Sequence, residues 1–311
     1  MTANSNNIKN LAFIAHGGAG KTTLTEMCLL NSGLIDNSGS VDKGNTHSDF
    51  TPEEKDHKYS INNSYFTFNW NNKQINLIDT PGYPDFRGEV ASALRMVEGA
   101  VLVINGTAGI EVNTDYVWSL AGDNNLSRFI FINKMDEEGA DFNEIYTELQ
   151  NNFEETLIPV TVPLRSEEDF KGILDILNQK MIENGQKKDL EDKSISENYR
   201  LELLEKIVEL DDELMMKYLE DEPINNKELS EVLIKGVRNK KIVPVFTGSS
   251  LENIGVKSFL NYLVKITPGP LEREKVITKS DGENKEFKID KNGPLVGIVG
   301  KTKVDPYIGK L

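Results

Sequence analysis

The chain has 311 residues, of which 38% are hydrophobic, enough to bury a sizeable core, and its length suggests about two domains. Its net charge of −15 excludes a protein that simply coats nucleic acid, because neutralising phosphates requires clustered Lys and Arg. We therefore expect no DNA partner and only local contact with RNA. Cys28 is the only cysteine in the sequence, so no internal disulfide can form.

The N-terminal residues Met1 to Asn10 are polar and lack the apolar core of a signal peptide. The longest apolar runs, such as Phe129 to Ile132, are too short to cross a bilayer. We therefore expect a soluble, cytoplasmic protein with no membrane partner. The sequence carries no information on oligomeric state, and a monomer is the default.

Short apolar runs bounded by turn residues recur along the chain, and each is typical of a buried strand. These runs are Leu11 to Ala15, Ile75 to Ile78, Ala100 to Ile104, Phe129 to Ile132 and Ile242 to Phe246. Helix-like stretches, Thr22 to Ser32 and Asp85 to Glu98, follow the first two runs. The alternation predicts an α/β fold with a doubly wound, mostly parallel sheet. In Ser64 to Trp70 the side chains instead alternate in character between the two sides of a strand. This favours an antiparallel edge strand before the Asn71-Asn72 turn.

The stretch from about Pro159 to Lys240 interrupts this alternation and separates two strands of the sheet. We therefore predict an inserted α/β subdomain over about 159–240. Within it, Glu197 to Leu219 places apolar residues at helical spacing, which predicts one amphipathic helix with an acidic outer face. Residues 165–240 include 20 acidic and 13 basic residues. A charged face of this kind is usually a solvated surface, and a docking surface is the alternative.

The domain that contains the insert is predicted to span residues 1–290. After a hinge at Pro268 to Pro270 and a polar stretch to Asn292, strand-like residues occur at Leu295 to Lys301 and Ile308 to Leu311. We expect residues 291–311 to begin a second domain and the chain to break off inside it.

A candidate phosphate-binding loop lies between the first apolar strand and the helix that follows. It matches the pattern G-x-x-x-x-G-K-S/T, with Ala15 in the first glycine position. Small residues let successive backbone N–H groups approach phosphates, Lys21 would reach the outer phosphates, and Thr22 would ligate Mg²⁺. A glycine-rich turn without a ligand is the alternative. The predicted phosphate-binding residues are Ala15, His16, Gly17, Gly18, Ala19, Gly20, Lys21, Thr22 and Thr23.

Three further elements follow predicted strands in the order that guanine-nucleotide binding requires. In Asp79-Thr80-Pro81-Gly82, Asp79 would hold Mg²⁺ through water and the Gly82 N–H would sense the γ-phosphate, although this tetrapeptide is also an ordinary turn. In Asn133-Lys134-Met135-Asp136, the Asp136 carboxylate can accept hydrogen bonds from guanine but finds no matching donors on adenine. Asn133 would brace the loops and the Lys134 stem would lie along the base.

The last element is Thr247 to Leu251, after the final strand of the predicted sheet. It would complete the base site with Ser249, Ser250 and Leu251, and the Ser250 backbone N–H is the predicted donor to the base O6. Four elements in this order, each at the carboxyl end of a strand, predict one composite site for GTP or GDP with Mg²⁺.

At this point the sequence resembles the translational GTPases, and among them elongation factor G over essentially the whole chain. The residues that carry this resemblance, besides the four elements above, are Phe86 to Val90, Leu94-Arg95, Val112, Val117-Trp118, Asp169 to Gly172, Leu210 to Leu214, Tyr218 to Glu220, Gly248-Ser249 and Asp305 to Leu311. The resemblance implies a P-loop GTPase domain, an insert that contacts the ribosomal stalk protein, and a β-barrel domain that starts near Gly293. It also implies the large-subunit RNA of the ribosome as a partner.

Three positions depart from the usual elongation factor G pattern. Gly18 stands where that family has Asp in the phosphate loop, and Ser60 stands where the first switch offers Thr, although its hydroxyl could still ligate Mg²⁺ beside Thr22 and Asp79. Tyr83 occupies the place of the histidine that positions the attacking water. A phenol could orient water but could not act as an imidazole would. These changes look like the divergent elongation-factor-G-like paralogues.

The resemblance leaves three hypotheses for function. The first is a ribosome-stimulated GTPase with a low intrinsic rate, acting in translocation or recycling, in which Lys21, Gly82 and Tyr83 serve catalysis. The second is a GTP-dependent, ribosome-associated binding factor with slow or lost hydrolysis, which Tyr83 and Gly18 favour. The third and weakest is a ribosomal protection factor.

Overall fold

The computed structural model describes residues 5–166, 169–183, 185–190, 192–273, 275–280, 283–290, 292–293, 297–302, 304–305 and 309–310. Within these residues the main sheet has seven strands in the order β2-β3-β1-β4-β5-β11-β6. They are β1 (Ile8–Ile14), β2 (Ser64–Trp70), β3 (Lys73–Asp79), β4 (Gly99–Asn105), β5 (Ser127–Asn133), β6 (Thr156–Pro159) and β11 (Ile242–Thr247). Neighbouring strands pair in parallel, except that β2 is antiparallel to β3.

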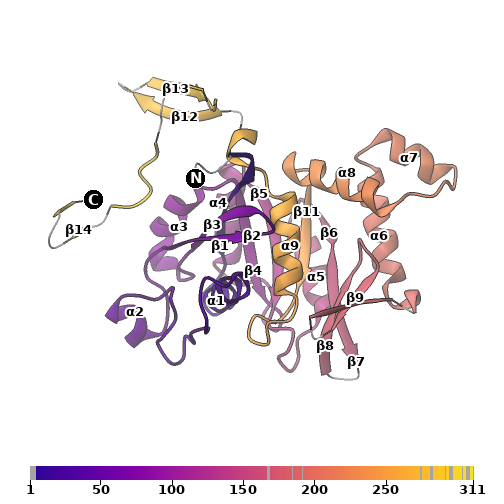
Figure 1. Cartoon of the computed structure of the whole chain (residues 1–311), viewed down its shortest axis with the longest axis horizontal. Coiled ribbons are helices and arrows are strands. Elements are labelled where there is room, and N and C mark those ends of the chain that lie inside the picture. The colour runs from indigo at the N-terminus through magenta and orange to yellow at the C-terminus, as the bar shows by residue number, and fades with distance from the viewer. Residues whose placement is uncertain are drawn as a thin grey trace.

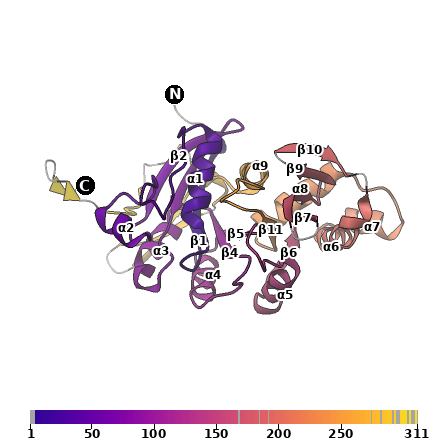
Figure 2. The same cartoon turned by 90° about the horizontal axis from the view of Figure 1, so that it is seen from below.

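Helices cover both faces of this sheet. Helices α1 (Lys21–Ser32) and α9 (Val256–Ile266) lie on one face, and α3 (Arg87–Leu94), α4 (Thr114–Asp123) and α5 (Phe142–Asn152) lie on the other (Figures 1 and 2). The short helix α2 (Pro52–His57) lies in the connection between α1 and β2. The predicted α/β fold with a doubly wound, mostly parallel sheet is therefore confirmed.

The core explains why the central strands are almost continuously apolar. Every residue of β11 is buried, and so is β4 up to Ile104, because helices cover both sides of a parallel sheet. On one face, Phe259 of α9 packs against Phe131 and Phe246, with ring centroids 4.8 and 5.2 Å apart. This aromatic cluster attaches α9 to the strands whose ends carry two of the predicted nucleotide elements.

The predicted antiparallel edge strand is confirmed as β2. Its burial alternates, as expected for a strand with one covered face. Asn71 and Asn72 connect it to β3 with φ values of 46° and 61°. Both lie in the left-handed region that a two-residue hairpin turn requires and that asparagine tolerates.

The residues between β6 and β11 form a separate group of elements, on the right of Figure 1 and coloured from dark pink to orange. Strands β7 (Thr161–Ser166), β8 (Asp169–Asp175), β9 (Lys180–Glu183) and β10 (Gln186–Asp189) form an antiparallel sheet in the order β10-β9-β8-β7. Helices α6 (Glu197–Val208), α7 (Asp212–Leu219) and α8 (Asn226–Arg238) follow. This is the α/β content that we expected of the insert.

The single amphipathic helix predicted over Glu197 to Leu219 is wrong, because the structure has α6 and α7 in its place. Asp211 interrupts the helix with an extended backbone, φ −146° and ψ 113°. Its side chain accepts a hydrogen bond from the Leu214 N–H and caps α7. Apolar spacing continues across the break and therefore hides it.

The helix predicted over Asp85 to Glu98 is also shorter than expected. A 3₁₀ turn, η2 (Pro84–Phe86), precedes α3, and α3 ends at Leu94. The Glu98 N–H donates to the carbonyl of Asn10 on β1, so the chain has already turned into the sheet ahead of β4.

The C-terminal part differs from the sequence prediction. The stretch interpreted as polar linker contains an antiparallel pair, β12 (Lys275–Ser280) and β13 (Glu283–Lys288), and β14 (Val304–Asp305) pairs with β15 (Gly309–Lys310). The described residues 297–302, part of the first strand-like stretch, have no regular secondary structure. Residues 294–296, 303, 306–308 and 311 lie outside the described part, so a β-barrel domain over 291–311 stays a prediction.

None of the helices in the described part of the chain has the length and apolar character that a membrane span needs.

Candidate nucleotide-binding site

The four predicted elements lie at one edge of the main sheet. Strands β1, β3, β5 and β11 run parallel, so their carboxyl ends meet at the same edge. The loops after these strands are residues 15–20, 80–83, 134–136 and 248–251. Loops at this edge of a doubly wound sheet are the usual location of a ligand site in such folds.

The phosphate loop leads from β1 into the N-terminus of α1. Gly18 and Gly20 have φ values of 84° and 91°, a backbone conformation that glycine adopts without strain. Gly20 is the N-cap of α1, so no capping side chain covers the first-turn N–H groups, to which Thr22 and Thr23 belong. Ala19 is buried, and His16 and Gly17 are half-buried. The loop can therefore present backbone donors to an anion.

Lys21 is buried and its ammonium donates to the His16 carbonyl at 3.2 Å. Burial lowers the pKa of Lys21 to about 8, and the nearby Asp79, Glu111 and Asp49 carboxylates oppose this shift. An anionic phosphate beside Lys21 would favour its charged form.

Gly82 lies directly against the phosphate loop. A Cβ atom at residue 82 would be 2.5 Å from the Lys21 Nζ and 2.8 Å from the Gly17 Cα. Such contacts are too close for any side chain, so the approach requires glycine. The structure thus brings the predicted sensor of the outer phosphate next to the lysine that would bind it.

The predicted metal ligands Thr22, Ser60 and Asp79 meet in a cluster of oxygen atoms. The Thr22 and Ser60 hydroxyls are 3.2 Å apart, and Ser48 donates to one Asp79 oxygen at 2.5 Å. Ser60 also donates to Asp49 at 2.7 Å. Hydroxyl and carboxylate oxygens are the donors that Mg²⁺ prefers.

Two buried carboxylates of this cluster are poised for a cation. Burial raises the pKa of Asp79 to about 6, against the opposing effects of its Ser48 hydrogen bond and of Lys21. Burial also raises the pKa of Asp49, which accepts hydrogen bonds from Ser60 and Thr46. The second Asp79 oxygen is buried and accepts no hydrogen bond from the described residues. A cation or its water ligand would satisfy that oxygen.

No group of three or more His, Cys, Asp or Glu side chains that could hold a metal occurs among the described residues. In the oxygen cluster the carboxylates are those of Asp79 and Asp49, beside the hydroxyls of Ser48 and Ser60. This suits Mg²⁺, which is usually held by one or two carboxylates together with substrate phosphates and water.

Asn133 joins two of the loops. Its amide nitrogen donates to the Ala19 carbonyl at 2.9 Å, and its amide oxygen accepts from the Ser250 N–H at 2.8 Å. A Cβ at Gly20 would be 2.4 Å from that amide nitrogen. The phosphate loop and the last loop are thus held in contact through one buried side chain.

In the structure the Ser250 N–H donates to the Asn133 side chain at 2.8 Å, so its role as donor to the base O6 stays a prediction. In the parallel pairing of β11 with β5, Thr247 lies opposite Ile132, and the loop that follows β11 brings Ser250 to Asn133. Ser249 is buried, and its hydroxyl accepts from the Glu252 N–H at 3.0 Å, while Leu251 is exposed. These two residues therefore shape the loop and its rim.

Asp136 has one buried carboxylate oxygen that accepts no hydrogen bond from the described residues. An unpaired buried acceptor costs about 1–3 kcal/mol, so a donor from a ligand would relieve it. Lys134 has a left-handed backbone, φ 63°, and its ammonium pairs with Glu137 at 3.0 Å. The loop therefore offers an unsatisfied acceptor of the kind that guanine donors would complete.

Tyr83 lies over the phosphate loop within a small group of aromatic rings. A Cβ at Gly17 would be 3.2 Å from two of its ring carbons. The Tyr59 ring packs on Tyr83 with centroids 4.7 Å apart, and Tyr59 also lies near His57 and Phe86. The position that would carry the water-positioning residue is thus filled by a packed phenol.

Sequence reasoning missed several residues that hold the site together. Asn113 is buried, donates to the Gly82 carbonyl at 3.1 Å and accepts from Arg87 at 3.0 Å. Ser48 and Asp49 belong to the oxygen cluster, and no pattern marked them. Glu26 is fully buried in α1 and accepts from the Gly39 and His47 N–H groups. The one available signal was Glu26, an acid that directly precedes the apolar run Met27 to Leu30 in α1.

The family model for the elongation factor Tu GTP-binding domain matches residues 6–269. The match begins ahead of β1 and ends after α9, so it includes all four elements at the sheet edge. The chain belongs to the elongation factor Tu GTP-binding domain family.

Other members of this family are similar over nearly the whole chain. Elongation factor G of Thermotoga maritima is 40% identical over 98% of this chain and 46% of its own length. Elongation factor G of Thermotoga sp. strain RQ2 is 39% identical over 98% of this chain and 45% of its own length. A Thermus thermophilus protein of known crystal structure superposes with a TM-score of 0.86 and 30% identity, covering 98% of this chain and 44% of that one. The chain therefore spans just under half the length of these relatives.

The residues present fit the ligands of an elongation factor Tu GTP-binding domain. The unpaired Asp136 oxygen fits guanine, and the open first turn of α1 with Lys21 fits phosphates. The unpaired Asp79 oxygen, with Thr22 and Ser60, fits Mg²⁺. The family match and the geometry of the loops are thus both consistent with a nucleotide site at this edge of the sheet.

Proposed function

We propose that this chain is the guanine-nucleotide-binding part of a GTP-hydrolysing translation factor of the elongation factor G type that acts on the ribosome. The observation that carries the proposal is the meeting of four loops at one sheet edge, where Asp136 and Asp79 each keep one buried oxygen without a partner among the described residues. The similarity to elongation factors G supports the ribosome as partner. Translocation and recycling are equally compatible with this site.

Each part of the site has a proposed task. The first-turn N–H groups of α1 and Lys21 bind the phosphates and stabilise the charge that develops in the transition state. Asp79, Thr22 and Ser60 hold Mg²⁺, which would neutralise charge on the outer phosphates when bound. Gly82 contacts the outer phosphate through its backbone, and Tyr83 orients the attacking water.

The isolated chain should hydrolyse GTP slowly. Arg87, the arginine that follows Tyr83 most closely, donates to Asn113 and lies over the Tyr116 ring with its guanidinium carbon 3.9 Å from the centroid. That guanidinium is engaged on α4 and is not placed as an arginine finger. We expect an unassisted rate on the order of 10⁻⁴ s⁻¹, as for small GTPases without such a finger. A rate above roughly 0.1 s⁻¹ without a partner would contradict this assignment.

Base specificity is tested with Asp136→Asn. This change replaces an acceptor by an amide and should weaken GTP binding by about a hundredfold or more while strengthening binding of xanthosine triphosphate, whose base offers an acceptor in place of the amine. Equilibrium titration of both nucleotides against the parent chain gives the two affinities. Unchanged GTP affinity would show that the base binds elsewhere.

A second function is favoured by the packing of Tyr83 against Gly17 and Tyr59. In this alternative the protein is a GTP-dependent ribosome-associated factor that holds GTP and hydrolyses it slowly. GTP turnover with and without ribosomes separates the two. Strong stimulation supports the GTPase, whereas tight GTP binding without stimulation supports the binding factor.

We also propose that the group of elements between β6 and β11 is an inserted subdomain that contacts the ribosomal stalk protein. Helix α7 exposes Met216 and Leu219, and acidic residues precede and follow them in the sequence. Titration of the stalk protein against Leu219→Glu should show at least about tenfold weaker binding if this face docks, since buried apolar anchors dominate such contacts. Equal binding by Leu219→Glu and the parent would show that the acidic face is only a solvated surface.

We further expect a cytoplasmic monomer, and light scattering of the purified chain tests the oligomeric state.

A further inference from the structure

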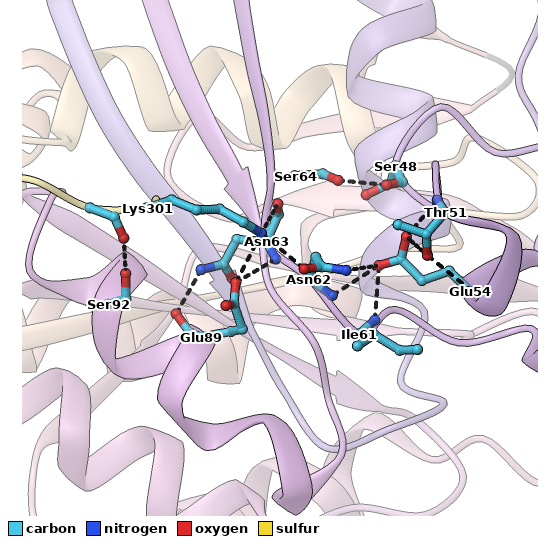
Figure 3. Close-up of polar contacts among 11 residues, drawn as sticks. Ser48, Thr51, Glu54, Ile61, Asn62, Asn63, Ser64, Glu89, Ser92 and Lys301 are labelled. Atoms are coloured by element: carbon cyan, nitrogen blue, oxygen red, sulfur yellow. Dashed lines mark hydrogen bonds and ion pairs between the residues drawn. The ribbon is translucent and has the colours of Figure 1, made fainter. Parts of the chain in front are cut away.

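Lys301 lies in the C-terminal segment, yet its side chain reaches into the nucleotide-binding part of the fold (Figure 3). Its ammonium contacts the Glu89 carboxylate at 3.2 Å, the Asn62 side-chain oxygen at 3.2 Å and the Asn63 carbonyl at 3.4 Å. The Lys301 side chain is 17% exposed. Its partner Glu89 is 33% exposed, so the ion pair is partly screened by solvent, though less than a fully exposed surface pair.

Glu89, on α3, connects Lys301 to the backbone ahead of β2. The same Glu89 oxygen that pairs with Lys301 accepts the Asn63 N–H at 2.9 Å. The Asn63 side chain in turn donates to the Glu89 carbonyl at 2.7 Å, and Asn63 is buried. Lys301 thus contacts both α3, through Glu89, and the backbone ahead of β2, through Asn63.

Asn62, the other contact of Lys301, is tied to helix α2. The buried Glu54 carboxylate accepts the N–H groups of Ile61 and Asn62 at 3.0 and 2.9 Å, and the Thr51 N–H at 2.9 Å. Burial would raise the pKa of Glu54, but these hydrogen bonds outweigh it and lower that pKa. The connection between α1 and β2 is therefore held from two sides, by Glu54 and by Lys301.

The same short stretch carries hydroxyls of the oxygen cluster. Ser60 donates to Asp49 and lies 3.2 Å from the Thr22 hydroxyl. Ser64 donates to the Ser48 carbonyl at 2.5 Å, and Ser48 donates to Asp79. Residues 60–64 thus contact Lys301 through Asn62 and Asn63 (Figure 3), and they contact the oxygen cluster through Ser60 and Ser64.

We propose that Lys301 is a positioning residue for the nucleotide site. It acts by holding residues 60–64 against α3. Docking of the C-terminal segment and binding of Mg·GTP therefore favour each other. The proposal rests on the proposed function. Coupling of this kind is reciprocal. A ligand that orders residues 60–64 at the metal also strengthens the contacts of Lys301 with these residues. The Ser92 hydroxyl, which donates to the Gly300 carbonyl, helps to hold the same segment on α3.

The test is Mg²⁺-dependent binding of a non-hydrolysable fluorescent GTP analogue to the chain. Lys301→Ala should raise the Mg²⁺ concentration for half-maximal binding about fivefold, within the usual range of coupling between sites. Lys301→Arg, which keeps the charge, should stay close to the parent. Lys288→Ala removes an exposed lysine from the same C-terminal part and serves as the matched control, with no change expected.

A structural defect would lower the melting temperature of Lys301→Ala. The melting temperature is therefore measured in parallel, and it should change by no more than that of Lys288→Ala. Glu89→Gln should reproduce the effect, and adding Lys301→Ala to Glu89→Gln should add little, because both remove one interaction. Coincident Mg²⁺ curves for Lys301→Ala and Lys288→Ala would overturn the inference and leave the proposed function standing. A parent chain that binds no GTP would overturn both.

Discussion

The Tyr83 ring lies beside Gly17, where an added Cβ would be 3.2 Å from two ring carbons, and it packs on the Tyr59 ring with 4.7 Å between the two ring centroids. The phenol is therefore held over the phosphate loop by packing, although its side chain remains partly exposed. A residue held in this way can orient a water molecule only as its packing allows. The predictions below begin with this contact.

Tyr83→His should raise ribosome-stimulated GTP turnover if the phenol limits hydrolysis, because a positioned imidazole contributes about 10²-fold or more. GTP affinity should change little. Tyr83→Phe is the matched control, since it keeps the ring that packs against Gly17 and Tyr59 and removes only the hydroxyl. Multiple-turnover assays with ribosomes measure all three proteins, and equal rates for Tyr83→His and Tyr83→Phe would remove Tyr83 from the mechanism.

Gly20→Ala and Gly18→Ala form a pair that separates backbone strain from a direct clash. Both glycines have positive φ, so either alanine should cost about 1–2 kcal/mol. At Gly18 a Cβ meets nothing within 4 Å, whereas at Gly20 it would lie 2.4 Å from the Asn133 amide nitrogen. Gly20→Ala should therefore lose about 1–3 kcal/mol more and bind GTP more weakly, because the Asn133 bridge is displaced. Equal unfolding free energies from urea titration would rule out this bridge as a stabilising contact.

Glu26→Gln should loosen the connection between α1 and α2. The two Glu26 oxygens accept from the Gly39 N–H and the His47 N–H, each at 2.6 Å, and the amide group of glutamine can serve only one of them. The orphaned donor should cost about 1–3 kcal/mol of unfolding free energy. Limited proteolysis should then cut within residues 34–50 faster than in the parent. An unchanged cleavage rate and stability would show that water replaces the lost acceptor.

Glu98→Gln should stabilise the chain above pH 6 but not below pH 4.5. Burial raises the pKa of Glu98 from 4.5 to about 6, with the Asn10 hydrogen bond opposing. Between these pH values the native state binds more protons than the unfolded state, so the parent loses stability as pH rises through this window. The difference should reach about 2 kcal/mol at neutral pH, because about 1.36 kcal/mol corresponds to one pKa unit. Urea unfolding at pH 4.5 and pH 7 measures it, and a pH-independent difference would contradict the assignment.

Local features of the sequence were sufficient for the sheet and for the four nucleotide elements. Apolar runs bounded by turns predicted β1, β3, β4, β5 and β11, because strands covered on both faces must be apolar throughout. Glycines of the phosphate loop were recognisable, because a backbone that curves around an anion excludes side chains. Asn71-Asn72 was sufficient for the hairpin, because few residues accept two successive left-handed conformations.

Features that depend on one buried polar group or one capping residue were predicted wrongly or missed. Asp211 ends the predicted long helix through a single hydrogen bond, and the apolar spacing continues across it. The pair β12 and β13 was hidden by polar composition, although Asp281-Gly282 between them is a typical hairpin dipeptide in sequence. The hydrogen bond from the Ser250 N–H to Asn133 was also missed, because the two residues lie 117 positions apart in the sequence.

The sequence by itself determined the kind of fold, the order of the nucleotide elements and the replacement of the expected histidine by Tyr83. These follow from local periodicity and from side-chain identity. The tertiary structure decided which distant groups meet: Ser48 with Asp79, Asn133 with Ser250, and Lys301 with Glu89. Their separations of 31, 117 and 212 residues carry no local signal, because folding brings such groups together through strand pairing and helix packing and not through spacing along the chain.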